Sequence, residues 1–504
     1  MARRALALAA AGLVAAAVLG PLLAVLRVAG TAGGLAPADL AALRFTLVQA
    51  ALSAALSVLL AVPVARALAR RRFPGRAALV TALGAPFLLP ALVGAIGVLA
   101  VWGRSGLLAD GLGAVGVEMP SIYGLQGVVL ASVFLNLPLA VRLLLQGWAA
   151  IPAERFRLAA SLGAGPWDAF RLLEWPMLRA AAPGAAAVVF LVCLTSFAVA
   201  LTLGGGPRAT TLELAIYEAF VFSFDLPRAA ALALVQAALG LAAAMVGMAL
   251  ALPSALGGGL DRPVERWDGA SPLLDGAWIA AAAAFLGLPL LAIVADGAAR
   301  VVALPGPVWW AAGRSVVVAA SAAALCLGLA LILAVATRGR WAEGVAALGL
   351  AISPLAIGTG LFLIVNAHLD PARVALPVTA LVNAMAALPF ALRALLPAAR
   401  EAEADHGRLA DSLGMRGVAR LRLVILPRLR RPLGFSAGLA AALSMGDLGV
   451  VTLFAAQDAT LPLQMYRLMG AYRMEDAAGA ALLLMALALG LFAACDGWGR
   501  RAAP

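Results

Sequence analysis

Long apolar stretches separated by short polar segments make up most of this chain of 504 residues. Twelve of them reach the length of about 20 residues that a helix needs to cross a bilayer. Their approximate ranges are 5–26, 46–67, 77–101, 124–146, 180–203, 229–252, 277–298, 314–336, 343–366, 375–398, 432–455 and 477–496. The pattern predicts an all-α polytopic membrane protein with about 12 transmembrane helices. The first stretch lacks a convincing cleavage site, so it predicts a membrane anchor and not a removed signal peptide.

A segment rich in glycine and proline, residues 253–276, divides the stretches six from six. We expect it to be a cytoplasmic linker between two transmembrane domains, residues 1–252 and 277–504. An even number of crossings in each half brings both halves into the membrane the same way up. The expected fold is therefore two homologous six-helix domains related by a parallel pseudo-twofold axis along the membrane normal.

The distribution of charge predicts the orientation and excludes several functions. All 37 basic residues are arginines, so the chain has no lysine for a nucleotide-binding P-loop, and any ATP hydrolysis belongs to another polypeptide. With 64% hydrophobic residues, the net charge of +12 indicates topology and not nucleic-acid binding. Residues 70–76 and the pair Arg338 and Arg340 follow the positive-inside rule when both termini are cytoplasmic.

The cysteines and histidines are isolated. Cys193, Cys326 and Cys495 are an odd number without paired spacing, and the two histidines are far apart in the sequence. The sequence therefore predicts no disulfide, no metal site and no cofactor.

One polar, arginine-rich segment occurs twice. RLAASLG at residues 157–163 returns as RLADSLG at 408–414, and a proline follows thirteen residues after each final glycine, at Pro176 and Pro427. These landmarks shift by 251 residues, half the chain, and Pro138 and Pro389 keep the same offset. Such islands in an apolar chain indicate two matching cytoplasmic surfaces for a soluble partner.

Each copy predicts a helix, a tight turn and a second short helix. We expect a helix over 153–162, a left-handed Gly163, and a second helix that Pro166 starts and Pro176 ends. In the second copy the expected turn is Gly414–Gly417 and the stop is Pro427. Small side chains where a partner's groove would approach closely are Ala159, Ala160 and Ala410. The alternative is an amphipathic loop that binds lipid headgroups through its arginines, but that role does not require the same spacing twice.

At these residues the chain resembles the MetI-like permease subunits of binding-protein-dependent ABC importers. Their loop carries E-A-A, three residues, a glycine, and later a proline usually preceded by leucine. The matching positions are Ala159, Gly163, Phe170 and Pro176, then Ala410, Gly414, Leu426 and Pro427. The resemblance implies two coupling loops, 151–177 and 401–428, that dock on two copies of an ATPase subunit. Arginine replaces the usual glutamate at 157 and 408, which leaves the charge partner open.

A closer similarity covers nearly the whole chain. The fusion of two such domains is similar to the subgroup that handles ferric iron and thiamine, and residues 196–220, 443–454 and 461–473 resemble its thiamine importers. This implies a bacterial inner-membrane permease that receives thiamine or its phosphate esters from a periplasmic binding protein. Ferric iron or another small solute is the alternative substrate.

A few polar residues lie in predicted membrane segments. Asp447 is the one acid in 432–455, and its repeat counterpart is Ser196. We expect both on the translocation path, because an acid at that depth is costly unless it faces water or a partner; the alternative for Asp447 is hydrogen bonding within the bundle. Asn136 and Asn383 are predicted to join helices. Residues 204–217, which begin with three glycines, predict a plugging helix, a receptor-docking surface or a packed outer loop.

Two other classes of function fit the sequence less well. An ion-coupled secondary carrier would need acidic or histidine relays in several helices, and it would not explain the paired loops. A membrane-embedded enzyme would need a constellation of catalytic side chains that the sequence does not assemble. We therefore expect a permease that makes and breaks no covalent bonds.

Overall fold

The computed structural model describes residues 2–83, 88–113, 116, 119–206, 209–250, 272–337, 344, 348–349, 351–454 and 459–501. The helices of the first half are α1 Ala2–Ala29, α2 Pro37–Arg70, α3 Arg76–Ala82, α5 Ala91–Trp102, α6 Leu107–Gly113, α7 Leu125–Ala149, α8 Ala153–Ser161, α9 Pro166–Ala169, α10 Trp175–Leu194, α11 Phe197–Leu203, α12 Leu212–Val221 and α13 Leu226–Ala249. Those of the second half are α14 Pro272–Ala298, α15 Gly306–Ala336, α17 Pro354–Asn366, α18 Ala375–Ser412, α19 Gly417–Arg420, α20 Leu426–Met445, α21 Gly449–Phe454, α22 Leu461–Gly470 and α23 Met474–Arg501. Most of the expected linker lies outside the described residues, and α14 already begins at Pro272.

The prediction of an all-α polytopic membrane protein is confirmed. Among the described residues, ten helices are long and apolar enough to cross a membrane. The other two expected spans, 343–366 and 432–455, take a different form. Within the first, α17 has 13 residues, and the second is broken where α20 ends and α21 begins.

The two halves repeat the same packing and exchange their first helices. In the first half α2 packs against α7 and α10, and in the second α15 packs against α18 and α20 in the same way. Helix α1 lies on its own α13 but also on α17 and α15 of the second half, while α14 lies on its own α23 and on α5 and α2 of the first. Each half thus covers part of the other's surface.

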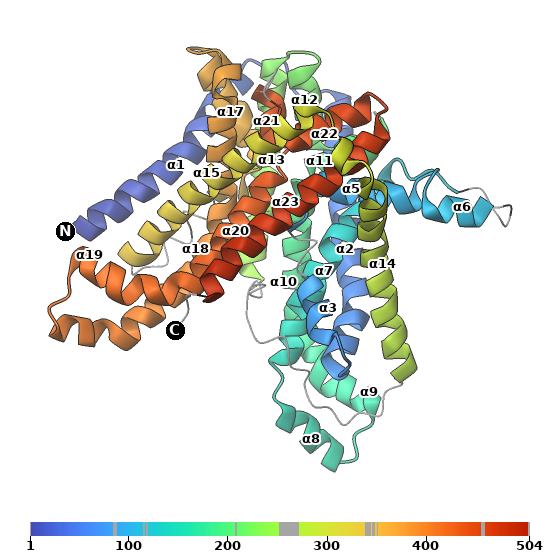
Figure 1. Ribbon diagram of the computed structural model, residues 1–504, viewed down its shortest axis with the longest axis vertical. Helices are drawn as coiled ribbons and strands as arrows, with labels where there is room; N and C mark the ends of the chain where they lie inside the picture. Colours follow the sequence, from blue (N-terminus) through green and yellow to red (C-terminus); the bar gives the residue numbers. More distant parts are fainter. Residues whose placement is uncertain are drawn as a thin grey trace.

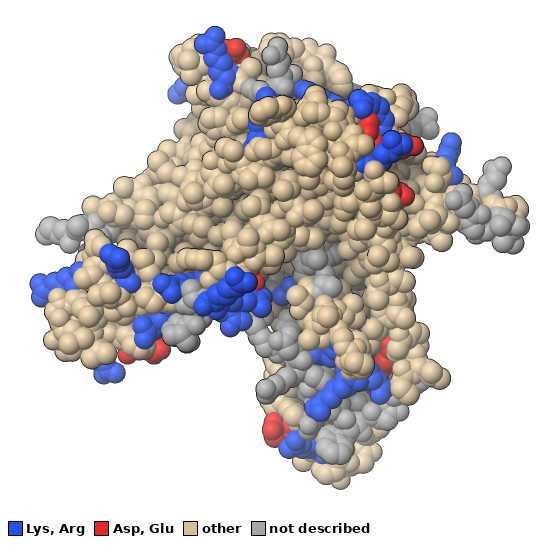
Figure 2. Space-filling model, in the orientation of Figure 1, with Lys and Arg blue, Asp and Glu red and all other residues tan. Residues whose placement is uncertain are grey.

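The bundle divides into two arms that diverge toward one side (Figure 1). One arm ends in α8 and α9 and the other in α19 with the end of α18, so the duplicated loop lies at both tips. Figure 2 shows arginines gathered near the ends of both arms. We call this side of the molecule the loop side; α1 begins and α23 ends toward it (Figure 1).

Two buried hydroxyls hold equivalent helices on the opposite side. The backbone N–H of Leu212, at the start of α12, donates to Thr46 Oγ1 of α2 at 2.8 Å. The N–H of Leu461, at the start of α22, donates to Ser315 Oγ of α15 at 2.8 Å. Because the first N–H groups of a helix have no partner within the helix, these hydroxyls satisfy donors that would otherwise be buried and unpaired.

The helix that follows each duplicated loop breaks within the bundle. Helix α10 ends at Leu194, and α20 ends at Met445. In the first half the buried carbonyls of Cys193 and Leu194, at the end of α10, accept from Gln49 Nε2 at 2.9 Å and Gln236 Nε2 at 2.8 Å. Irregular backbone at membrane depth is tolerated where protein satisfies it or where it lines a cavity, and the two breaks meet that condition.

Candidate functional site

The first loop has the predicted local structure as far as its second helix. Helix α8 ends before Gly163, whose φ of +74° places it in the left-handed region. The N–H of Gly163 donates to the Ala160 carbonyl at 3.0 Å, and the N–H of Ala164 donates to that of Ala159 at 3.0 Å. These bonds satisfy carbonyls at the helix end, and Pro166 then begins α9 as predicted.

The expectation that Pro176 and Pro427 stop the second helix is wrong. The chain stays helical through a π-helical segment, 170–174 in the first copy and 421–425 in the second, and passes directly into α10 or α20. Each proline lies in the first turn of that long helix. The N–H that proline lacks costs little free energy at this position, directly after the wider π-helical turn. Each loop is therefore joined without a break to the helix that crosses the bundle.

The two copies differ in how the chain enters the loop. In the first half α7 ends at Ala149, and the chain turns at Pro152 before α8 begins. In the second half α18 continues for 38 residues to Ser412, because no proline stands at the corresponding position. The turn that follows uses Gly414 at φ +65° and Gly417 at φ +57°, as predicted.

The positions matched to the family motif have different environments. Gly163, Gly414, Ala160 and Pro176 are exposed, whereas Ala159, Leu426 and Pro427 are half-buried and Ala410 is buried at 2%. Phe170 is half-buried, stacks on Trp167 at 5.6 Å, and lies 5.2 Å below the Arg66 guanidinium. The glycines are thus open to a partner, while Ala410 packs within its own arm.

Four large apolar side chains of each loop are exposed at corresponding positions. With exposed fractions in parentheses, the pairs are Leu158 (61%) with Leu409 (58%), Leu162 (77%) with Leu413 (62%), Trp167 (70%) with Val418 (76%), and Leu172 (64%) with Leu423 (60%). Every pair keeps the 251-residue offset. We call the first set the first docking surface and the second set the second docking surface. Sequence reasoning missed these residues, although their constant offset was visible in the repeat.

Different side chains hold the two loops in shape. Arg420, 8% exposed, donates to Glu403 Oε1 at 2.7 Å, to Asp411 and to the Gly407 carbonyl at 3.3 Å. In the first half Arg66 of α2 pairs instead with the fully buried Glu174 of the π-helical segment. Both arrangements fix a loop to its own arm through an arginine, so the loops can move with the helices that carry them.

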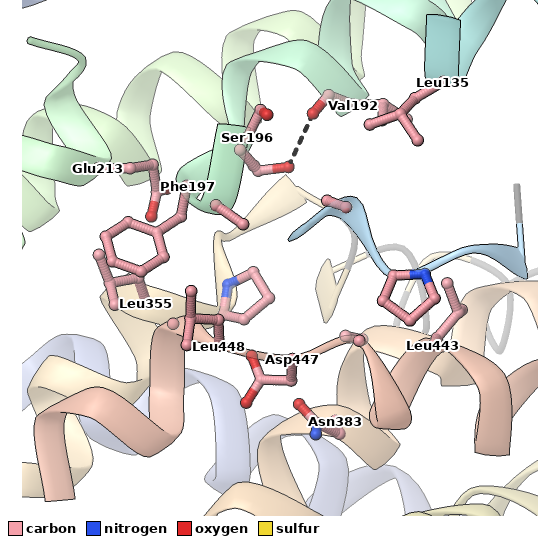
Figure 3. A pocket seen from close by; sticks show the side chains of 18 of the residues that line it. Leu135, Val192, Ser196, Phe197, Glu213, Leu355, Asn383, Leu443, Asp447 and Leu448 are labelled. Atoms are coloured by element: carbon pink, nitrogen blue, oxygen red, sulfur yellow. Dashed lines mark hydrogen bonds between the residues drawn. The ribbon is translucent and has the colours of Figure 1, made fainter. Parts of the chain in front are cut away.

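A cavity of about 330 Å³ lies where the two halves meet. Ser196 and Asp447, the residues predicted for the translocation path, both line it, next to the breaks after α10 and α20. Asn383, Glu213 and Phe197 also line it, so α18, α12 and α11 contribute (Figure 3). The structure therefore brings the two predicted path residues together in one place.

The two asparagines join helices as predicted, and they also line the cavity. Asn136 Nδ2 donates to the Ser132 carbonyl at 2.8 Å and lies 3.5 Å from Cys193 Sγ on α10. Asn383 Nδ2 donates to Ser444 Oγ on α20 at 3.0 Å. Their other role, as part of the cavity wall, was not predicted.

Glu213 is a cavity residue that sequence reasoning placed in an outer loop. It lies in the first turn of α12 and is 1% exposed. Of the outer segment 204–217, Pro207 lies outside the described residues, and the part from Leu212 forms a buried helix that reaches the cavity. The signal that could have found Glu213 is that it is the one acid in that apolar segment.

A two-fold repeated helical bundle with a cavity between its halves and a matched pair of apolar surfaces at its tips defines a membrane transport permease. A search with models of known protein families finds no match. The chain is 42% identical to the thiamine transport system permease protein ThiP of Brucella abortus, over 90% of this chain and 86% of that protein. The corresponding protein of Escherichia coli is also 42% identical, over 89% and 87%.

The chain therefore belongs to the family of thiamine transport system permease proteins. A shorter relative, the molybdenum transport system permease protein ModB of Azotobacter vinelandii, is 33% identical over 35% of this chain and 78% of its own length. Less than half of the present chain thus matches most of a smaller permease, and the resemblance to ABC importer permeases is confirmed.

Proposed function

We propose that this chain is the transmembrane permease of an ATP-driven importer that carries thiamine or its phosphate esters inward from a periplasmic binding protein. Its domains are residues 1–252 and 277–504, it lies in a bacterial inner membrane, and both termini are cytoplasmic. Family membership supports the substrate, since the relatives at 42% identity are named for thiamine transport. The loop side is then the cytoplasmic side.

The observation that carries the assembly is the matched pair of docking surfaces. Exposed apolar groups at the tip of an arm that lies outside the membrane are unfavourable in water, and such patches mark protein interfaces. Two surfaces with corresponding side chains suit two copies of one partner. Because the chain has no lysine and hence no P-loop of its own, we assign ATP hydrolysis to that partner, an ATPase subunit that docks once on each surface.

The continuous helix from loop to cavity gives the mechanism. Closure of an ATPase dimer draws the two docking surfaces together. The π-helical segments 170–174 and 421–425 lead without interruption into α10 and α20, so the displacement reaches the breaks at Ser196 and Asp447. Movement of these cavity walls exposes the substrate to one side of the membrane and then to the other. The permease itself makes and breaks no covalent bonds.

Reconstitution tests the proposal. Proteoliposomes that contain the permease and its ATPase, supplied with receptor and thiamine, should accumulate thiamine only when ATP is available to the ATPase. Ferric iron and molybdate under the same conditions should not accumulate. Uptake by the permease alone, driven by an ion gradient, would support the secondary-carrier class and contradict the proposal.

The docking residues are tested separately. Gly163→Asp combined with Gly414→Asp places a charged side chain at two exposed left-handed positions. Co-purification of the ATPase and thiamine uptake should both be lost while membrane insertion remains normal. Normal uptake by this variant would contradict the assignment of the loops to ATPase docking.

A further inference from the structure

The cavity wall is acidic. Among the described residues that line it, the ionisable side chains are two carboxylates, Glu213 and Asp447, and none is an arginine or histidine. One carboxylate comes from each half of the chain. Burying a carboxylate is unfavourable unless hydrogen bonds or an opposite charge compensate it, and the described lining supplies no opposite charge.

Each carboxylate has one oxygen without a hydrogen-bond partner among the described residues. These buried atoms are Glu213 Oε1 and Asp447 Oδ2. The other Asp447 oxygen, Oδ1, accepts from the N–H of Val450 at 3.5 Å and so serves the start of α21. Buried acceptors without a partner are rare in folded proteins, so these two oxygens are the atoms that a ligand in the cavity would pair with.

Phe197 brings the two carboxylates into one site. Its ring packs edge-on against Tyr217 at 5.3 Å, and Tyr217 lies one helical turn after Glu213 on α12. A Cβ placed on Gly449 would lie 3.7 Å from the Phe197 ring and 3.9 Å from Asp447 Oδ1, so this ring and Asp447 are neighbours across the boundary between the halves. Figure 3 shows Glu213 beside Phe197 and Asp447 on the facing wall.

We propose that Glu213, Phe197 and Asp447 form a transient binding site for an organic monocation inside the permease. Two acceptor oxygens and an aromatic face suit a positively charged heterocycle, through charge-assisted hydrogen bonds and cation–π contact. The volume of about 330 Å³ fits one small molecule. The inference rests on the proposed function, and the ligand it assigns is the thiazolium and aminopyrimidine part that thiamine and its esters share.

The test compares thiamine with its neutral thiophene isostere, which has the same shape without the positive charge. Uptake of both is measured in proteoliposomes with wild-type permease, Glu213→Gln and Asp447→Asn, with the same ATPase and receptor throughout. The receptor's own preference then cancels when variants are compared. Both amides keep the shape of the carboxylate and one acceptor oxygen, so the new side chain at position 447 can still accept from the N–H of Val450.

Each substitution should lower the preference for thiamine over the isostere by about tenfold or more, which corresponds to one lost hydrogen bond to a charged group. Uptake of the neutral isostere should stay near the wild-type rate. The matched control is Glu218→Gln, the same change on the same helix at an exposed position outside the cavity. The preference of this control should not change. Asp447→Glu keeps the negative charge that Asp447→Asn removes, so it should retain much of the wild-type preference.

An unchanged preference in both amide variants, with an active wild-type complex, would overturn the cation site and leave the proposed function intact. A wild-type complex that takes up no thiamine would overturn the proposed function and this inference together. If a variant does not assemble with the ATPase, chemical modification of the wild-type protein tests the inference instead. Thiamine should slow modification of Glu213 and Asp447 by a hydrophobic carbodiimide, measured by mass spectrometry, and equal modification with and without thiamine would overturn the inference.

Discussion

The docking surfaces allow a prediction whose size follows from exposure. Leu162 and Leu413 occupy corresponding positions and are 77% and 62% exposed. Full burial of an exposed leucine contributes about 1.5–3 kcal/mol, so the exposed part of each side chain supplies about 1–2 kcal/mol when an ATPase covers it. Truncation to alanine removes most of that contribution and should weaken each docking event by about 5- to 30-fold.

Biolayer interferometry measures this effect directly, with permease held in nanodiscs and purified ATPase in solution. The single variants Leu162→Ala and Leu413→Ala should each weaken one of the two docking events. The double variant should weaken both docking events, each by as much as the matching single variant does, because α8 and the end of α18 lie on different arms (Figure 1). Leu369→Ala is the control, since Leu369 is 61% exposed but lies beyond the far end of the 38-residue α18.

The outcome that refutes this reasoning is a double variant that binds the ATPase as wild type does. A loss of the same size in Leu369→Ala would also refute it, because the effect would then be general and not confined to the docking surfaces.

Three further predictions concern stability. Gly163→Ala, at φ +74°, should cost about 1–2 kcal/mol and weaken ATPase binding, whereas Gly165→Ala, at φ −75°, should not. Arg420→Met should loosen the second loop by about 2 kcal/mol, seen as faster hydrogen exchange over residues 403–425, and the exposed Arg416→Met should leave exchange unchanged. Thr46→Val should leave the Leu212 N–H unpaired and lower stability by about 1–3 kcal/mol, measured as a lower midpoint of thermal unfolding; an unchanged midpoint would contradict the capping role.

Local features of the fold were predictable where one residue type determines the backbone. Gly163 follows a helix and takes the left-handed φ that the sequence predicted, and Gly414 and Gly417 form the turn expected in the second copy. The same reasoning failed at Pro176, because a proline ends a helix in one context and begins one in another. The choice depends on the π-helical turn before it, which no single residue in the segment specifies.

The candidate site was predictable in part for a related reason. The repeat connected Ser196 with Asp447, and the structure places both on the cavity. Glu213 was assigned to an outer loop, because periodicity does not reveal that a short helix folds back into the bundle. The exchange of α1 and α14 between the halves was likewise not predicted, because an apolar helix surface does not specify which half of the chain it packs against.

The crossed first helices have a consequence for how the molecule moves. Helix α1 packs on α17 of the second half, and α14 packs on α5 of the first, so each half holds a helix of the other. Separation of the two halves would break the contacts of α1 and of α14 at the same time. A rocking motion about these two contacts leaves them in place. Residues 1–252 and 277–504, expressed as two separate polypeptides, should therefore still associate in the membrane.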